Sequence, residues 1–232
     1  MKEDHPVIAT ENSIKYYTFP LKSQKTGFYC DQRENRLLLS SFCTGKRVLD
    51  LCCYTGSFSL NAAIHGDAAS CVGVDSSQDA IDVAIRNAEL NKLPQSKVQF
   101  VRDEISNFMK TSAMNADEFD VIVLDPPKLA PSVMGLDRAS KKYHSLNRDA
   151  LKLMNAKGGV FLTCTCSGAM TQKNGGQFFL ETVQRAALSA GRRITLLKTN
   201  GAASCHTQFP SSFPAEAYLT AVLFYVSPKN MN

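Results

Sequence analysis

Three aspartates are placed where a folded chain could use them to hold a nucleoside. Asp50, Asp75 and Asp103 each lie in or just after a short apolar run that is typical of a buried strand. A carboxylate at the end of the second strand can accept both hydrogen bonds of a ribose diol, and one after the third can accept from an adenine amino group. An aspartate near a strand end is also a common turn or cap residue. Three in series nevertheless favour a nucleoside cofactor.

The turn after Asp50 narrows the choice of cofactor. A tight turn between a strand and a helix brings a ligand against backbone N–H groups and a helix N-terminus. A dinucleotide-binding turn needs the spacing G-x-G-x-x-G, whereas this turn has Gly56 alone. Cys52 and Tyr54 stand where glycines are common. The order of an acid, a glycine turn, two further acids and then Asp125-Pro-Pro is typical of class I S-adenosylmethionine-dependent methyltransferases.

Strand-like and helix-like segments alternate along most of the chain and predict how these residues are positioned. Strands are expected at 47–53, 71–75, 98–102, 119–125, 159–166, 193–198 and 217–226, and helices at 61–64, 77–91, 105–109, 136–154 and 176–190. This alternation is typical of βαβ units. We therefore predict an α/β fold with a Rossmann-like, doubly wound, mostly parallel seven-stranded sheet. Such sheets bind ligands at the carboxyl ends of their strands.

Residues 1–40 break this rhythm and are predicted to form a small N-terminal β-hairpin appendage. Residues 14–20 are typical of one strand, and residues 25–31 of a turn followed by another. Residues 41–232 would then form the methyltransferase domain. Ser76, with Asp79 three residues later, is similar to a capping box at the start of the helix predicted over 77–91.

Composition argues against several classes of protein. The chain has 232 residues, a net charge of +5 and eight cysteines without a C-x-x-C pair. Zinc-ribbon and thioredoxin-like folds therefore lose their main support, and we expect no metal site. The first residues have the mixed charge that a secretion signal lacks, and the apolar run at 217–226 is too short to cross a bilayer. We expect free thiols in a reducing compartment, the cytoplasm or an organelle reached by a removed transit segment.

Four ordered motifs resemble those of a known family. Residues 25–36 (KTGFYCDQRENR), 54–58 (YTGSF), 125–128 (DPPK) and 163–167 (TCTCS) resemble the PUA-type large-subunit ribosomal RNA cytosine-5 methyltransferases. The similarity runs from about residue 14 to residue 226. It implies a Rossmann-like catalytic domain that binds S-adenosylmethionine and acts on RNA. Too few residues precede Lys25 for the family's PUA module, so the chain is either truncated or finds RNA without it.

The resemblance also implies a role for residues at the fourth and fifth strand ends. Cys166 would be the nucleophile that adds to C6 of cytosine and lets C5 attack a methyl group; the alternative is a buried strand cysteine. Asp125 would border the cofactor and hold or protonate N3 of the base. Pro126, Pro127 and Lys128 would contact the substrate. The cofactor would be held by Asp50, Tyr54, Gly56, Asp75, Asp103 and Asp125.

Weaker similarities leave other positions open. Tyr143 matches a family aromatic but could equally pack its helix, and packing is the expected role of Cys164. His206 keeps a family histidine whose neighbours differ here, so a loop histidine is the default interpretation. Four residues of the hairpin-to-helix motif border the cofactor or RNA, or form an interdomain hydrogen-bond network: Tyr29, Gln32, Arg33 and Arg36.

The sequence therefore predicts an RNA methyltransferase that forms 5-methylcytidine in ribosomal RNA through a cysteine–C6 adduct. Two alternatives stay open. One is a methyltransferase of the same fold that acts on guanine or a small molecule. The other is an RNA-associated assembly factor without catalysis, which the single-glycine turn and the altered 205–207 loop would suit.

Overall fold

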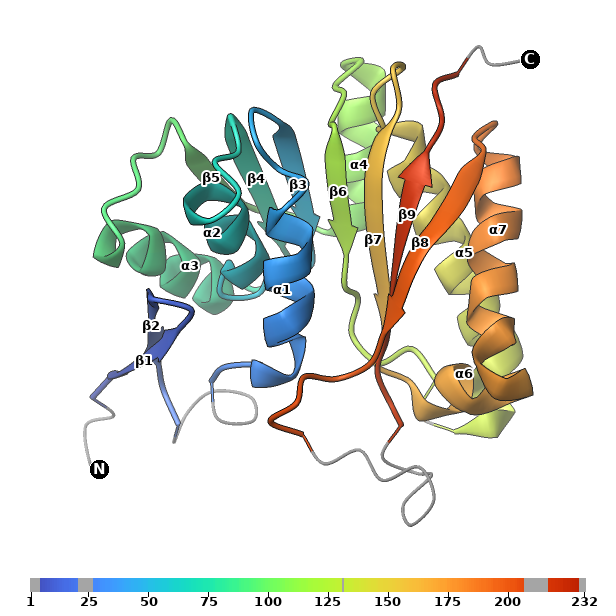
Figure 1. The fold of residues 1–232 in the computed structure, drawn as a ribbon, viewed down its shortest axis with the longest axis horizontal. Helices are drawn as coiled ribbons and strands as arrows, with labels where there is room; N and C mark the ends of the chain where they lie inside the picture. Colours follow the sequence, from blue (N-terminus) through green and yellow to red (C-terminus); the bar gives the residue numbers. More distant parts are fainter. Residues whose placement is uncertain (1–4, 21–26, 131, 207–216, 230–232) are drawn as a thin grey trace.

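The computed structural model describes residues 5–20, 27–130, 132–206 and 217–229. Its main feature is a seven-stranded sheet in the order β5-β4-β3-β6-β7-β9-β8 (Figure 1). Neighbouring strands from β5 to β7 are parallel, and β9 is antiparallel to both β7 and β8. This arrangement confirms the predicted doubly wound, mostly parallel sheet. The strands are β3 (Arg47–Leu51), β4 (Ser70–Asp75), β5 (Val98–Arg102), β6 (Val121–Leu124), β7 (Gly159–Thr165), β8 (Ile194–Asn200) and β9 (Thr220–Val226).

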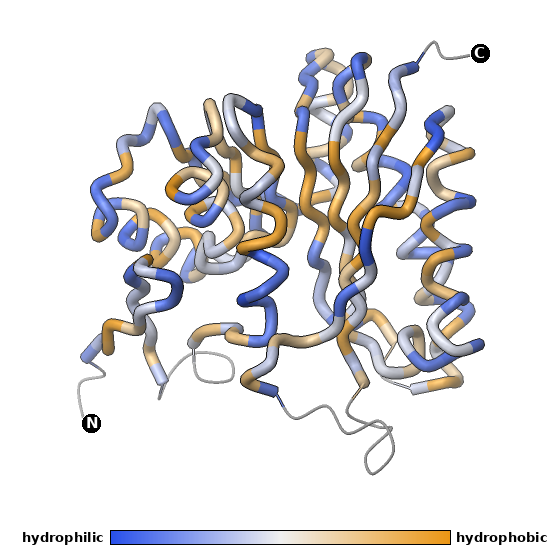
Figure 2. Tube along the Cα trace, in the orientation of Figure 1, coloured by the Kyte–Doolittle hydropathy of each residue, from blue (hydrophilic) through white to orange (hydrophobic). Residues whose placement is uncertain are grey.

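Helices cover both faces of this sheet because its central strands are apolar on both sides. All four residues of β6 are buried, as expected of a parallel strand between two helical layers. One layer holds α1 (Arg33–Ser40), α2 (Ser57–Ile64) and α3 (Gln78–Leu90). The other holds α4 (Ile105–Met114), α5 (Leu136–Lys152), α6 (Gly168–Gln172) and α7 (Gln177–Ser189). Figure 2 shows hydrophobic residues along β6 and hydrophilic ones at the start of α1.

A two-stranded antiparallel hairpin precedes the sheet, which confirms the predicted appendage and its strand over 14–20 but not its second strand. The strands are β1 (Val7–Glu11) and β2 (Ile14–Thr18), joined at Asn12 and Ser13. Both turn residues have positive φ, 50° and 65°, as a tight hairpin turn requires. The strand predicted over 25–31 was wrong within the described residues 27–31. There the chain forms a turn and the short 3-10 helix η1 (Cys30–Gln32), which leads directly into α1.

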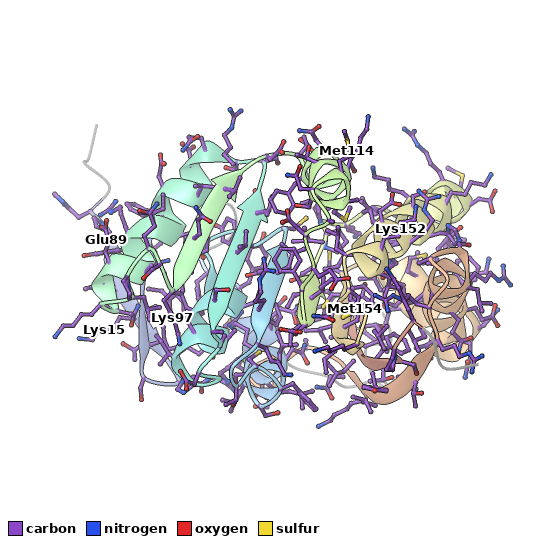
Figure 3. All side chains as sticks on the ribbon, turned by 90° about the horizontal axis from the view of Figure 1, so that it is seen from above. Lys15, Glu89, Lys97, Met114, Lys152 and Met154 are labelled. Carbon is purple, nitrogen blue, oxygen red and sulfur yellow. The ribbon has the colours of Figure 1, made fainter. Side chains whose placement is uncertain are left out.

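The hairpin is fixed to α3 through two asparagine side chains. Asn91 accepts from the Lys15 N–H at 2.9 Å and donates to the Lys15 carbonyl at 2.6 Å. Asn87 accepts from the Tyr17 N–H at 2.7 Å. The two amides thus satisfy backbone groups that a neighbouring strand would otherwise pair. Figure 3 shows Lys15 and Glu89 projecting from this margin of the molecule, whereas Met154 lies inside it.

Across the part of the chain that the structure describes, no helix combines the length and apolar character needed to span a bilayer.

Candidate active site

A cavity of about 1150 Å³ opens at the carboxyl ends of the central strands, where a doubly wound sheet is expected to bind its ligands. The volume exceeds the roughly 300–1000 Å³ of a usual small-molecule site. It leaves room for a cofactor and part of a second molecule. Seven of the residues predicted from the sequence line it: Tyr54, Asp75, Asp125, Pro126, Pro127, Lys128 and Cys166. The other three, Asp50, Gly56 and Asp103, lie behind or beside this lining.

The first turn reaches its shape with a single glycine. Cys52, Tyr54 and Gly56 all have positive φ, at 64°, 49° and 81°. A left-handed conformation costs a non-glycine residue about 1–3 kcal/mol, so surrounding contacts must hold the first two. Gly56 cannot be replaced by a larger residue without a clash, because a Cβ there would lie 2.5 Å from the Phe100 ring. The turn therefore has a strained backbone at Cys52 and Tyr54 and no room for a side chain at Gly56.

Asp75 holds this turn against the start of α3. Its Oδ2 accepts from the Tyr54 N–H at 2.9 Å, and its Oδ1 accepts from the Ser77 N–H at 3.0 Å. Each carboxylate oxygen keeps a second lone pair, and the side chain is partly exposed at the cavity. Ser77, not Ser76, caps α3: its Oγ accepts from the Ala80 N–H at 3.3 Å. The N-cap residue predicted at Ser76 therefore lies one residue later, at Ser77.

Asp50 supports the turn from inside the protein and does not reach the cavity. Its Oδ2 accepts from both the backbone N–H and the hydroxyl of Ser59, at 3.0 and 2.8 Å. Burial raises the pKa of Asp50 to about 7, although the bonds from Ser59 act in the opposite direction. Its Oδ1 has no hydrogen-bond partner among the described residues. This carboxyl group therefore fixes the start of α2.

Asp103 lies beside the cavity rather than on it. Both of its carboxylate oxygens accept from the Asn107 side chain, at 3.0 and 3.1 Å, on the exposed surface. The next three residues along the chain, Glu104, Ile105 and Ser106, line the cavity instead. Sequence reasoning found the correct strand end and missed Glu104, the neighbouring acid.

Asp125 lies at the cavity with a partner from the N-terminal segment. The Gln32 side-chain amide donates to its Oδ2 at 2.9 Å, and the Asn35 side chain in turn donates to Gln32 Oε1 at 2.7 Å. Burial raises the pKa of Asp125 to about 6, while the bond from Gln32 acts to lower it. The neighbouring Cys164 side chain also acts to lower the pKa of Asp125. Asp125 can therefore change protonation state near neutral pH.

Cys166 is directed to the cavity by the residues on either side of it. Thr165 and Ser167 are fully buried, whereas Cys166 is partly exposed. Thr165 donates to the Tyr143 hydroxyl at 2.8 Å, and Ser167 donates to the Ala130 carbonyl at 2.6 Å. These bonds fix the end of β7, so Cys166 alone among residues 163–167 has its side chain at the cavity.

Two residues near Cys166 have packing roles. Tyr143 is completely buried, and its ring meets Phe179 edge-on at 5.4 Å between centroids. This favours the packing interpretation of Tyr143 over contact with a substrate. Cys164 is also completely buried within β7, and burial raises its pKa well above the usual range. A thiol in that setting stays protonated and unreactive.

The N-terminal segment and the start of β9 complete the cavity. Tyr29, Gln32 and Arg36 line it, but Arg33 does not. Tyr218 also lines it and donates from its hydroxyl to Asp31 at 2.7 Å. The sequence pattern did not single out Tyr218, since it precedes β9 in what looks like an ordinary apolar run.

Arg36 also belongs to a buried hydrogen-bond network. Its guanidinium forms a two-point ion pair with Glu11, at 2.8 and 2.6 Å. It also donates to the Tyr29 carbonyl at 3.0 Å and to the Ser57 hydroxyl at 3.3 Å. Arg36 therefore links the hairpin to the sheet domain, as the network interpretation predicts, and it also borders the cavity.

The sheet order and the acid-rich cavity at its strand ends define a class I methyltransferase fold. Residues 6–224 match the S-adenosylmethionine-dependent methyltransferase family, and the chain belongs to that family. Its cofactor is S-adenosylmethionine. The donor set fits: Asp75 has unused lone pairs for a diol, and the turn between Cys52 and Gly56 brings backbone close to the cavity.

Several known proteins are similar to this chain. The ribosomal RNA large subunit methyltransferase I of Aeromonas hydrophila subsp. hydrophila is 43% identical over 212 residues, covering 90% of this chain and 52% of that protein. The enzyme of the same name from Escherichia coli strain SMS-3-5 is 38% identical over 209 residues, covering 90% and 51%. The chain thus spans about half the length of these curated relatives.

Solved structures agree with the fold. The crystal structure of SMU.776 complexed with SAH is 25% identical, with a TM-score of 0.83 over 97% of this chain and 57% of that one. Trm5b from Pyrococcus abyssi is 20% identical, with a TM-score of 0.68 over 97% and 57%. The second likeness concerns the fold alone.

Proposed function

We propose that this chain is the catalytic part of an RNA methyltransferase that forms 5-methylcytidine, with large-subunit ribosomal RNA as substrate. The observation that carries the proposal is that Cys166 and the Asp125-Pro126-Pro127 loop lie side by side in the lining of one cavity. The Cys166 thiol lies 3.8 Å from the Pro126 carbonyl oxygen, so the thiol and the loop share one wall. The names of the similar ribosomal RNA methyltransferases support the choice of RNA.

The cofactor half of the site follows from the first turn and Asp75. Asp75 binds the ribose diol with its free lone pairs, and its bonds to Tyr54 and Ser77 keep the carboxylate in place. Glu104 extends the acidic lining beyond Asp75. When bound, S-adenosylmethionine supplies an electrophilic methyl group on its sulfonium sulfur. Asp50 and Gly56 act on this half indirectly, by fixing the turn.

The base half of the site follows from Cys166 and Asp125. The Cys166 thiolate forms a bond to C6 of cytosine, and the C5–C6 double-bond electrons make C5 nucleophilic. The sulfonium methyl would pass to C5 as its S–C bond breaks, leaving the thioether S-adenosylhomocysteine. A base would then remove the C5 proton, and the Cys166 thiolate would leave as the C5–C6 double bond re-forms. Asp125 is positioned to donate a proton or a hydrogen bond to N3 as charge develops there. Its raised pKa favours that role, because a protonated carboxyl can donate.

The basic residues Lys128 and Lys142 give this half of the cavity its charge for an RNA ligand. Both side chains are exposed and line the opening. Two such cations contribute to phosphate binding that weakens as salt rises. Their placement supports a polynucleotide substrate over a small neutral one.

A trapping experiment tests the proposal. RNA that contains 5-fluorocytidine has no removable C5 proton, so methylation should leave the chain covalently attached to RNA. We expect a labelled protein–RNA adduct for the native chain and none for Cys166→Ala, with cofactor binding retained. Cys71→Ala is the matched control, because Cys71 is a buried strand cysteine on β4, remote from the cavity lining. An adduct in Cys166→Ala would refute the assignment of the nucleophile.

Nucleoside analysis separates the remaining alternatives. The chain is incubated with labelled S-adenosylmethionine and ribosomal RNA, and the RNA is digested to nucleosides. Label in 5-methylcytidine supports the proposal. Label only in a methylated guanosine would replace it with the first alternative. Tight cofactor binding without transfer to any RNA would replace it with the assembly-factor alternative.

A further inference from the structure

Three side chains of the types that bind metal ions meet outside the cavity. Cys30 of η1, Cys205 and His206 place one ligand atom each within 4.8 Å of one another. The Cys205 sulfur lies 3.3 Å from His206 Nδ1 and 3.4 Å from the Cys30 carbonyl oxygen. Cys30 and Cys205 are 175 residues apart in the sequence, so only the fold brings them together. A search for closely spaced cysteines in the sequence therefore could not have found this cluster.

The two thiols of the cluster differ from the others in the protein. All eight cysteines lie in the described part of the chain, and only Cys30 and Cys205 are exposed. A thiol that coordinates a metal ion is deprotonated outright, so both exposed sulfurs could serve as anionic ligands to a divalent cation.

The loop that carries two of the three ligands is already fixed to η1 and α1. The Ala203 N–H donates to the Asp31 carbonyl at 2.7 Å. The Ser204 hydroxyl lies between Arg33, which donates to it at 3.0 Å, and Glu34, which accepts from it at 2.9 Å. These contacts do not involve the sulfurs. The ligand atoms are therefore brought together by contacts independent of any metal, and little chain entropy remains to be lost on binding.

We propose that Cys30, Cys205 and His206 bind one Zn²⁺ ion, with solvent as the fourth ligand. Two thiolates and an imidazole form a common zinc ligand set. Bonds of about 2.3 Å to sulfur and 2.0–2.1 Å to nitrogen in a tetrahedral site put ligand atoms roughly 3.5–3.8 Å apart. The observed separations, 3.3 Å for one pair and within 4.8 Å for all, need only small side-chain rotations to match. Two thiolates also neutralise the divalent charge.

The proposed ion would join two segments that build the active site. Cys30 precedes Asp31 and Gln32, which contact Tyr218 and Asp125 at the cavity. Cys205 and His206 follow β8. A metal bond between them would restrain η1 without touching the cavity itself. The proposed ion would therefore act on the active site by restraining η1, and its solvent-occupied fourth position would stay open.

Metal titration tests this proposal. The full chain is reduced with a phosphine, freed of metal with a chelator and titrated with Zn²⁺ against a chromophoric competitor. We expect one ion per chain. Cys30→Ser, Cys205→Ser and His206→Ala should each weaken binding by more than the roughly 10–100-fold typical of losing an outer partner. Titration with Co²⁺ should give visible bands of a tetrahedral site and a near-ultraviolet sulfur band that disappears in both serine variants.

Two further variants serve as controls. Ser204→Ala removes the loop's contacts with Arg33 and Glu34 but no ligand, so it should keep stoichiometric zinc. Cys166→Ala should also keep it, which separates this cluster from the cavity thiol. Equal zinc uptake by the native chain and Cys205→Ser would overturn the proposal. So would reduced protein that takes up no zinc while the oxidised protein shows a Cys30–Cys205 disulfide by mass.

Discussion

Removal of the Glu11 carboxylate should destabilise the whole domain, because it leaves a buried positive charge without its counter-ion. The Arg36 side chain is 1% exposed and that of Glu11 is 6% exposed. In Glu11→Ala the guanidinium keeps only neutral partners, the Tyr29 carbonyl and the Ser57 hydroxyl. Breaking a buried ion pair in this way costs about 3–5 kcal/mol.

Urea denaturation measures this cost. With the slope expected of a domain near the upper end of the usual range, the midpoint should fall by roughly 1–2 M. A single transition that keeps its slope would show that the hairpin and the sheet unfold together. Changing both partners to apolar residues, Glu11→Leu with Arg36→Met, should recover part of the loss.

The exposed pair Arg33–Glu34 provides the matched control. Its side chains are 35% and 45% exposed, so Glu34→Ala should cost no more than about 1 kcal/mol. Equal losses for Glu11→Ala and Glu34→Ala would contradict the argument from burial. A two-step transition in Glu11→Ala would instead show that the hairpin contributes nothing to the rest of the fold.

Other predictions concern the cavity. Gly56→Ala should abolish cofactor binding, because a Cβ meets the Phe100 ring at 2.5 Å and φ is 81°; calorimetry that finds normal affinity would contradict this. Asp50 has a pKa raised to about 7. The stability that the protein loses by burying this carboxyl is therefore zero below the unfolded-state pKa of Asp50 and grows as pH rises to 7. Asp50→Asn should therefore gain stability over the native chain with rising pH, by up to about 1.4 kcal/mol per unit, in melts at pH 5 and pH 8. Gln32→Leu removes the bond that lowers the pKa of Asp125. The limb of the pH–rate profile that Asp125→Asn abolishes should move to higher pH, and an unmoved limb would count against this coupling.

The sheet could be predicted from the sequence because its strands are apolar and regularly spaced. The run at 119–125 is buried on both sides in β6, and burial on both faces leaves few alternatives to a central strand. The N-terminal hairpin could not be placed as well. Its turn uses Asn12 and Ser13 in left-handed conformations, a weaker signal than Asn-Gly. Residues 27–31 depend on contacts with distant parts of the chain.

The site shows the same limit. The positions of Asp75 and Cys166 follow from strand ends, which a local pattern marks. Tyr218 reaches the cavity through tertiary packing, which no local pattern encodes. Gln32 was marked only through the resemblance of residues 25–36 to a family motif, which left its role open. Asp50 and Gly56 illustrate a further distinction, since spacing identifies them correctly as part of the turn but does not tell whether a side chain faces the cavity or the interior.

The long-range contacts at the cavity also affect the order in which the site can form during synthesis. The Tyr218–Asp31 hydrogen bond spans 187 residues. At about 5–20 residues per second, the ribosome needs roughly 10–40 s to supply the second partner after the first. The turn around Asp75 can form long before Tyr218 exists. A growing chain thus has the part of the cavity lining around Asp75 early and completes the part that includes Tyr218 only when the segment just before β9 has been made.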